Sequence, residues 1–214
     1  MEIFLPVIDN GLGLSRTSWG VSLAATCAEV FRDDDLLFRH VSYPYPDGAL
    51  NIVANEFLES GADEMFVIDT DLVFDPRHIR YMREHDEPLV FGLYPKKEVG
   101  LTFPAEPLES GQSVWHADPH DSAVNPLVEV KRVARGLMRA KRAVFERLSP
   151  LVPEYKCDQS GKMRREFFRC LPGCHSEDFA FCDLWRSAGG RVLVDQRASV
   201  RHEGSAVYPI RGTF

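Results

Sequence analysis

Two carboxylates separated by one residue, Asp69 and Asp71, directly follow the apolar run Met65–Ile68. An unbroken apolar run of this length predicts a buried strand, and open α/β sheets bind ligands at the carboxyl ends of such strands. Two carboxylates this close repel each other unless a cation lies between them, and Mg²⁺ or Mn²⁺ bridged to a phosphate oxygen would relieve the repulsion. The alternative is that both aspartates cap a turn before Pro76.

Three more short segments follow in a fixed order. They are 134–138 (Ala-Arg-Gly-Leu-Met), 176–181 (Ser-Glu-Asp-Phe-Ala-Phe) and 201–204 (Arg-His-Glu-Gly). Together with Asp69-Thr70-Asp71, this set resembles the GT-A glycosyltransferases, in particular the compact family 2-like members of bacteria and phages. The resemblance extends from the first strand to His202, and the order of the motifs is more specific than a lone Asp-x-Asp.

The resemblance implies a role for each acidic residue and for the late histidine. Asp71 would bind the divalent metal, and Asp69 would contact the donor ribose or reach the metal through water. His202 would complete the metal site, since imidazole suits Mn²⁺. In inverting members the aspartate of the Glu-Asp pair is the general base, which implies that Asp178 accepts the acceptor's proton, with Glu177 as the other candidate. Alternatively, Glu177 and Asp178 are the acidic first turn of a helix, and His202 is a structural histidine.

The resemblance also implies which residues contact the nucleotide-sugar donor. Relatives hold the nucleotide base near the end of the first strand, where this chain has Pro6, Asp9 and, a little later, Trp19. Many relatives carry Ala-Arg-Asn at the start of the second helix, whereas residues 49–51 are Ala-Leu-Asn here. The donor contacts implied in this way are Pro6, Asp9, Asn51, Asp69 and Gly136. An aromatic residue at the position of Trp19 belongs to the core in the alternative interpretation.

The expected activity is transfer of a sugar from a nucleoside diphosphate donor, uridine-linked, to an acceptor hydroxyl. The expected cofactor is Mn²⁺ or Mg²⁺, and the expected outcome is inversion at the anomeric centre, with retention left open. A nucleotidyltransferase and a non-catalytic nucleotide-sugar or nucleic-acid binding module are the alternatives. The first would be expected to carry a basic, glycine-rich phosphate loop near the first strand, but residues 9–13 (Asp-Asn-Gly-Leu-Gly) are acidic and lack lysine.

Charge is unevenly distributed along the chain. The net charge is −7, yet residues 131–169 contain twelve Lys or Arg and four acids, so this segment is +8 and the remainder is −15. Such a segment can face phosphates, which makes DNA an acceptor hypothesis, for example a hydroxymethylated base of phage DNA. A glycan or protein acceptor is the other possibility, in which case these cations pair with acids elsewhere in the fold.

Length and composition fit one domain spanning residues 1–214, with a nucleotide-sugar-binding half (1–95) and an acceptor-side half (96–214). With 214 residues, 44% of them hydrophobic, the chain can bury a full core. No apolar stretch approaches the roughly 20 residues of a membrane helix, and the first residues lack the features of a signal peptide. We therefore expect no membrane partner and a cytoplasmic location, in a bacterium or a phage-infected host.

Alternating strand and helix patterns predict an α/β fold of the GT-A type, a Rossmann-like, mostly parallel sheet with helices on both faces. Strands are predicted at 2–8, 36–41, 65–68, 89–93, 127–130 and 191–194. Helices are predicted at about 18–31, 50–60, 76–85, 140–148 and 177–188, and a long loop at 94–125. Ser18 is the expected cap of the first helix, whose buried face would hold Val21, Ala24, Ala25, Ala28 and Phe31.

Four cysteines lie within 26 residues, with His175 among them: Cys157, Cys170, Cys174 and Cys182. They could hold a structural Zn²⁺, but their spacing contains no Cys-x-x-Cys pair. Reduced, buried thiols are the favoured interpretation.

Overall fold

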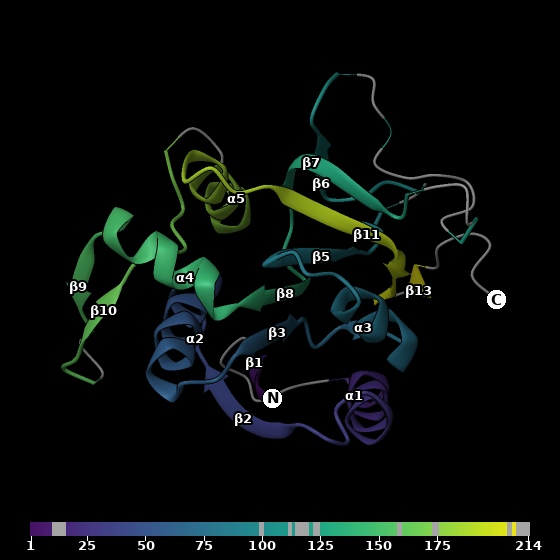
Figure 1. The fold of residues 1–214 in the computed structure, drawn as a ribbon, viewed down its shortest axis with the longest axis horizontal. Coiled ribbons are helices and arrows are strands. Elements are labelled where there is room, and N and C mark those ends of the chain that lie inside the picture. Colours follow the sequence, from purple (N-terminus) through teal and green to yellow (C-terminus); the bar gives the residue numbers. More distant parts are fainter. Residues whose placement is uncertain are drawn as a thin grey trace.

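An eight-stranded mixed sheet runs through the centre of the protein (Figure 1). The structure is a computed structural model that describes residues 1–9, 16–98, 101–110, 113, 120–121, 125–157, 160–172, 176–204 and 207–208. The described strands of the sheet follow the order β2-β1-β3-β8-β5-β11-β7-β6. Their bounds are β1 Glu2–Asp9, β2 Asp35–Ser42, β3 Glu64–Ile68, β5 Leu89–Leu93, β6 Ala105–Pro107, β7 Leu127–Val133, β8 Leu137–Lys141 and β11 Val192–Ser199.

Most of these strands point the same way. β1 is parallel to β2 and β3, and β5 is parallel to β11, whereas β8 lies between β3 and β5 and is antiparallel to both. β7 is antiparallel to β11, and β6 to β7, so only β7 and β8 of the eight described strands run against the rest. The predicted α/β class with a Rossmann-like, mostly parallel sheet is confirmed. Strands from both predicted halves of the chain build this one sheet.

Helices cover both faces of the sheet (Figure 1). One face carries α2 (Pro46–Ser60), α4 (Arg142–Leu148) and α5 (Glu177–Ser187), with the short 3-10 helix η1 (Ser149–Leu151) after α4. The other face carries α1 (Thr17–Glu29) and α3 (Pro76–Arg83). None of the described helices has the length and apolar character needed to cross a bilayer.

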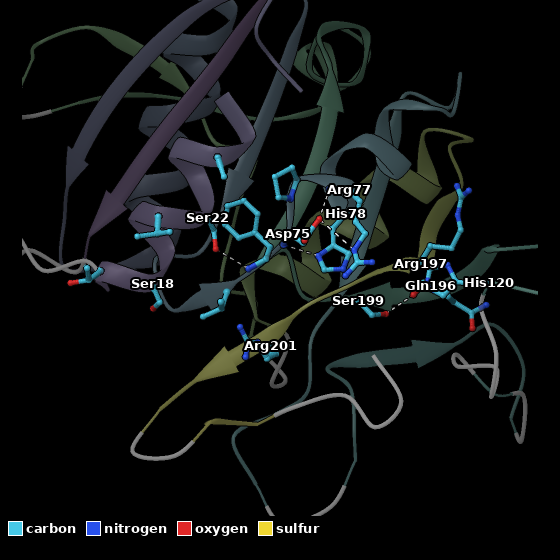
Figure 2. A pocket seen from close by; sticks show the side chains of 16 residues that line it. Ser18, Ser22, Asp75, Arg77, His78, His120, Gln196, Arg197, Ser199 and Arg201 are labelled. Atoms are coloured by element: carbon cyan, nitrogen blue, oxygen red, sulfur yellow. Dashed lines mark hydrogen bonds and ion pairs between the residues drawn. The ribbon is translucent and has the colours of Figure 1, made fainter. Parts of the chain in front are cut away.

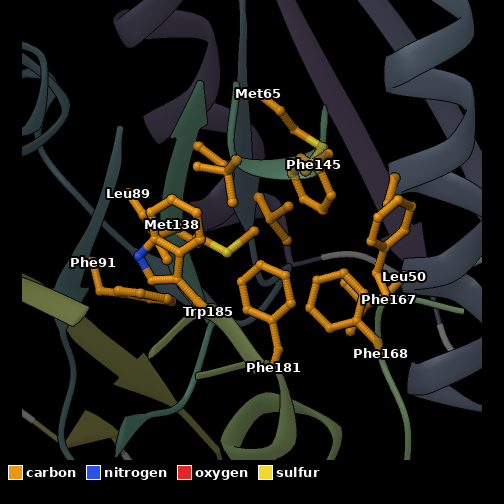
Figure 3. Packing of buried hydrophobic residues seen from close by; sticks show 14 of the residues in the cluster. Leu50, Met65, Leu89, Phe91, Met138, Phe145, Phe167, Phe168, Phe181 and Trp185 are labelled. Carbon is orange, nitrogen blue, oxygen red and sulfur yellow. The ribbon is translucent and has the colours of Figure 1, made fainter. Parts of the chain in front are cut away.

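Strand β3 shows how the core divides between the two faces. Met65 and Val67 pack into a cluster with aromatic side chains such as Phe145 from the helices (Figure 3). Phe66 and Ile68, which point the opposite way, belong to the second cluster under α1 and α3. Because side chains alternate along a strand, the consecutive apolar residues 65–68 supply core contacts to both faces of the sheet.

Two small sheets accompany the central one, and one of them carries His202, a residue of the candidate site. β4 (Leu72–Val73), β12 (Arg201–Glu203) and β13 (Val207–Tyr208) form one, and β9 (Glu154–Lys156) pairs with β10 (Met163–Arg165) in the other. β12 is antiparallel to β4, with His202 opposite Leu72. The sequence predicted none of these strands of two or three residues, because so short a segment carries too little periodicity to be recognised. It also missed β8, in which Arg139 and Lys141 interrupt the apolar residues.

The predicted buried face of α1 is wrong within the helix, although Phe31, which follows the helix, is buried as predicted. Val21 is 65% exposed, while Trp19, Ser22 and Thr26 are the buried residues of the helix. The large Trp19 side chain decides which side of the helix turns inward, although small alanines dominate the sequence pattern. Ser18 is also not the cap, because Arg16 occupies that position and the Ser18 hydroxyl donates to Glu203 instead (2.7 Å).

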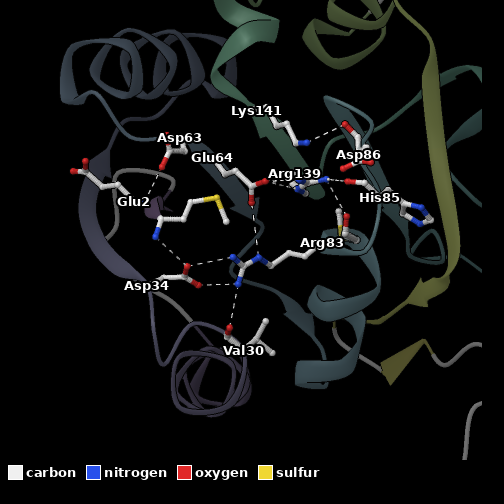
Figure 4. A network of polar contacts seen from close by, with 12 residues as sticks. Glu2, Val30, Asp34, Asp63, Glu64, Arg83, His85, Asp86, Arg139 and Lys141 are labelled. Atoms are coloured by element: carbon white, nitrogen blue, oxygen red, sulfur yellow. Dashed lines mark hydrogen bonds and ion pairs between the residues drawn. The ribbon is translucent and has the colours of Figure 1, made fainter.

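A buried ion pair joins β3 to β8 and to the turn after α3 (Figure 4). Arg139 and Glu64 are 2% and 3% exposed and bind each other through the guanidinium and carboxylate groups. Arg139 also donates to the carbonyls of Met82 (3.1 Å) and His85 (2.8 Å). Charges this deeply buried are tolerated only when they are paired and hydrogen-bonded, so these contacts fix where β8 enters the sheet.

Candidate functional site

The turn that carries Asp69 and Asp71 lies at the carboxyl end of β3, beside the start of β8. The Asp69 N–H donates to the carbonyl of Gly136 (2.8 Å), and the Leu72 N–H donates to the carbonyl of Asp69 (3.0 Å). Both aspartates and Thr70 line a cleft of about 750 Å³. The position at the end of a buried strand agrees with the sequence prediction.

His202 reaches Asp71 across 131 residues of sequence because β12 pairs with β4. The His202 Nε2 atom lies 3.3 Å from Oδ2 of Asp71, and Nδ1 lies 2.9 Å from the carbonyl oxygen of Pro95. A carbonyl only accepts hydrogen bonds, so Nδ1 carries a proton, and Nε2 is the ring nitrogen that faces Asp71. This is the orientation in which second-sphere contacts prepare a histidine for a metal.

Asp71 is held in its ionised form. Burial opposes its ionisation, but the contacts with His202 and with the Lys97 ammonium (2.5 Å) outweigh burial and lower the pKa of Asp71 to about 2. The charged carboxylate and the imidazole together offer two donors to a divalent cation.

These donors fit only part of a coordination shell. Among the residues that the structure describes, no three His, Cys, Asp or Glu side chains gather into a complete metal-binding group. Mg²⁺ bound to phosphates commonly uses one or two protein carboxylates and takes its other ligands from water and substrate. The pair of Asp71 and His202 fits an ion that is completed in this way.

Arg135 connects two of the acidic motifs. Its side chain is 10% exposed, forms a close ion pair with Asp69 and has its Nε 3.4 Å from Oδ1 of Asp178. Among the described residues, neither that Nε nor that Oδ1 has a hydrogen-bond partner. Arg135 also lines the cleft, so it places a buried positive charge beside the two aspartates.

Asp178 titrates near neutral pH. Burial is the main cause that raises its pKa to about 7; Glu177 and Asp69 raise it further, while Arg135 acts in the opposite direction. The residue lies in the first turn of α5, where the side chain of the cap residue Ser176 accepts from the Phe179 N–H. A carboxylate with a pKa near the working pH is suited to accept a proton in catalysis.

Gly136 allows Tyr94 to approach the backbone next to the turn. A Cβ atom at position 136 would lie 2.7 Å from carbon atoms of the Tyr94 ring, so only glycine fits there. The ring packs edge-on against His202, with centroids 5.1 Å apart. Burial raises the pKa of the Tyr94 hydroxyl, which therefore stays neutral.

The proposed donor residues are less closely grouped. Asp9 lines the cleft, where its carboxylate binds His40 (2.6 Å) and Ser42 (2.8 Å). Pro6 is buried within β1 and Asn51 within α2, and neither lines the cleft.

The Asn51 amide is hydrogen-bonded to the backbone of Phe168. Its Nδ2 donates to the carbonyl of Phe168 (2.7 Å), and its Oδ1 accepts from the N–H of the same residue (2.9 Å). Asn55, one turn later, makes the same kind of double contact with Arg165. Both asparagines therefore tie the segment 165–168 to α2. Trp19 is likewise part of the core.

Most cations of segment 131–169 are engaged within the fold. Those with an acidic partner are Lys131, Arg132, Arg135, Arg139, Lys162, Arg164, Arg165 and Arg169. Arg142 instead donates to three carbonyls at the end of α2. This pattern is the one expected if the segment pairs with acids elsewhere, and it lends no support to a DNA acceptor.

The cysteines show no zinc-like grouping in the described part of the chain. Cys157 and Cys182 are buried and Cys170 is exposed, all as free thiols, while Cys174 and His175 lie outside the described residues. Burial raises the pKa of Cys182 to about 12, so this thiol stays protonated.

The sequence analysis assigned no role to Arg135 or Tyr94, and it did not predict the contact between Lys97 and Asp71. Arg135 stands next to Gly136 inside a motif that had already been singled out, and that adjacency was the available signal. Tyr94 and Lys97 lie at the start of the long loop predicted at 94–125, and only the three-dimensional structure brings them to His202 and Asp71, respectively.

Comparisons with known proteins concern the fold. No protein-family model matches the sequence, and no curated protein matches it. Among solved structures, A197 from STIV is similar over 95% of this chain and 85% of its own, with 16% identity and a TM-score of 0.55. This likeness shows a shared fold.

Two further structures are similar at lower TM-scores. The inositol-1-phosphate CTP transferase from T. maritima has 9% identity over 92% of this chain and 85% of its own, with a TM-score of 0.46. A proposed glucose-1-phosphate thymidylyltransferase from Bacillus anthracis, in complex with a sucrose, has 12% identity over 71% and 76%, with a TM-score of 0.41. Both scores are too low to carry an argument.

Proposed function

We propose that the protein is a metal-dependent glycosyltransferase that moves a sugar from a nucleoside diphosphate sugar, with a uridine donor as first candidate, to an acceptor hydroxyl. The observation that carries the proposal is the meeting of four separate segments in one place. Asp69 and Asp71 follow β3, Arg135 precedes β8, Asp178 begins α5 and His202 lies in β12. The order and residue types of these segments are also those on which the resemblance to the GT-A glycosyltransferases rests.

Asp71 and His202 would hold the divalent ion, with Asp69 nearby. When bound, Mn²⁺ or Mg²⁺ neutralises charge that develops on the departing diphosphate. Asp69 contacts Arg135 in this structure, so the guanidinium group is already at the side of the cleft where an anionic donor would bind. A guanidinium group can form bidentate hydrogen bonds with phosphate oxygens. This property supports a role for Arg135 in positioning the diphosphate.

Asp178 would remove the acceptor proton. Its pKa of about 7 keeps a substantial fraction ionised at neutral pH, while its basicity exceeds that of an ordinary aspartate. Attack by the activated oxygen on the face opposite the departing diphosphate would invert the anomeric centre. Glu177 remains the second candidate for this role.

The first experiment is a thermal-shift panel of nucleoside diphosphates and their sugars, with and without Mn²⁺. We expect a metal-dependent rise in melting temperature with one base, and loss of that rise in Asp71→Asn and His202→Ala. A shift that is independent of metal would contradict the proposed site.

The second experiment measures turnover as donor hydrolysis and identifies the products. Asp178→Asn should retain metal-dependent donor binding and lose about 10²–10⁴-fold in turnover. Asp183→Asn, on the more exposed side of α5 with its partner Arg132, is the matched control. Release of a nucleoside diphosphate supports sugar transfer, whereas release of pyrophosphate from a nucleoside triphosphate would identify a nucleotidyltransferase. Donor binding without turnover in the wild type would favour a binding module.

A further inference from the structure

A second cleft, of about 740 Å³, lies between α1, the start of α3 and the strands β11 and β12 (Figure 2). None of the described residues lines both this cleft and the cleft at Asp69 and Asp71. Its volume falls within the range of about 300–1,000 Å³ that is typical of small-molecule sites. None of the residues proposed to take part in glycosyl transfer lines this second cleft.

Arginine side chains from α3, β11 and β12 line the second cleft. Arg201 on β12 is exposed, and it forms no ion pair with any residue that the structure describes. Arg77 lies 3.4 Å from Asp75, and both side chains are at least half exposed, which makes their pair weak. Arg197 is neutralised by Asp195 and Glu84, so Arg201 and Arg77 supply the available positive charge.

The wall of the cleft that α1 forms is partly apolar. Val21 is 65% exposed on this wall, and Ala25 follows it one turn later. Between them lies Ser22, whose hydroxyl oxygen accepts from the Phe74 N–H (3.2 Å). Within the described residues the Ser22 hydroxyl donates to no other group, so its hydrogen can be directed toward a ligand in the cleft. A cleft lined by both exposed apolar and cationic side chains suits a ligand with an anionic end and a less polar body.

The charge in this cleft comes from side chains and not from a helix terminus. At the start of α3, Asp75 accepts the Arg77 N–H (3.0 Å) and His78 accepts the Asp75 N–H (3.1 Å). Those backbone donors are therefore already used. Guanidinium groups bind phosphate oxygens through paired hydrogen bonds, and a phosphate monoester presents enough acceptors for Arg201, Arg77 and a serine hydroxyl together.

We propose that the second cleft binds a phosphate monoester with a partly apolar body, of the size of a nucleoside monophosphate. The phosphate contacts Arg201 and Arg77, and the body lies against Val21 and Ala25. This site is independent of the divalent metal.

The test is isothermal titration calorimetry of the full chain with AMP, UMP and inorganic phosphate, in buffer that contains EDTA. We expect saturable one-site binding of a nucleoside monophosphate and weaker binding of inorganic phosphate, which cannot use the apolar wall. Arg201→Gln should weaken binding about tenfold or more, because it removes a charge-assisted contact. Val21→Glu should weaken it as well, through like-charge repulsion.

Two control variants locate the binding. Arg80→Gln makes the same chemical change on an exposed α3 residue outside the cleft, and it should leave affinity unchanged. Asp71→Asn should also leave affinity unchanged. Absence of saturable binding at millimolar ligand, equal affinity of Arg201→Gln and the wild type, or loss of binding in Asp71→Asn would each overturn the proposal. Thermal unfolding of every variant verifies that it is folded.

Discussion

Compared with the wild type, the Asp178→Asn variant should gain stability as the pH rises. The reason is that the folded structure disfavours the charged carboxylate of Asp178, which the variant lacks. Asp178 has a pKa of about 7 in the folded protein against an ordinary value of 3.8, chiefly because it is buried. Each pKa unit corresponds to about 1.4 kcal/mol. Ionisation of Asp178 therefore lowers the free energy of unfolding of the wild type by about 4 kcal/mol. The Asn variant has no ionisable group at this position and keeps its stability.

The sign follows from proton linkage. The folded pKa is raised, so the contribution of protonated Asp178 is fully present below pH 4 and is lost as pH rises to about 7. About 3 kcal/mol of the loss falls between pH 5 and pH 8. Effects of the substitution that do not depend on pH, such as the lost partner of Arg135, cancel when the two pH values are compared.

Urea unfolding of the wild type and of Asp178→Asn at pH 5 and pH 8 measures this difference directly. The stability of the variant relative to the wild type should increase by about 3 kcal/mol between the two conditions. Asp183→Asn controls for the removal of one negative charge from α5. If the difference in unfolding free energy between the variant and the wild type is the same at both pH values, the raised pKa of Asp178 is refuted.

Three other substitutions test the framework of the site. Arg139→Met leaves Glu64 buried without its main partner and should cost about 3–5 kcal/mol in urea unfolding, with most of the loss recovered when Glu64→Gln is added; no recovery would contradict the role of the pair. Asn51→Ala should cost about 2–3 kcal/mol, since both bonds to Phe168 are lost, and should leave donor affinity in calorimetry unchanged; weaker donor binding would instead support the donor contact expected from sequence. Gly136→Ala places a Cβ 2.7 Å from an aromatic ring and should lower stability by about 1–3 kcal/mol and reduce turnover; wild-type melting temperature and turnover would show that the ring moves aside freely.

The sequence predicted the long elements well, and the reasons are physical. The apolar run 65–68 was readable as a strand because both faces of β3 are buried, and α2 was readable because its apolar residues recur at helical spacing up to Gly61. Gly61 ends the helix with a φ of 89°, which glycine adopts without strain. Burial on α1 was predicted wrongly because one tryptophan outweighs several alanines.

Proximity within the candidate site was only partly predictable. Local pattern located Asp71 at a strand end, and the order of motifs suggested that His202 would lie near it. No local signal predicts that two-residue β4 pairs with β12, which is what brings these side chains together. The ion pairs of Arg135 likewise depend on how β8 enters the sheet, which no short-range pattern encodes.

The central claim is that Asp71 and His202 hold a divalent ion for a nucleoside diphosphate donor. Its most direct test is a crystal soaked with Mn²⁺ and a uridine diphosphate sugar, measured at the manganese absorption edge. The account predicts one anomalous peak in contact with the Asp71 carboxylate, His202 Nε2 and the diphosphate oxygens. A donor bound at this cleft with manganese elsewhere, or with no manganese while Asp71 and His202 still contact each other, would contradict it.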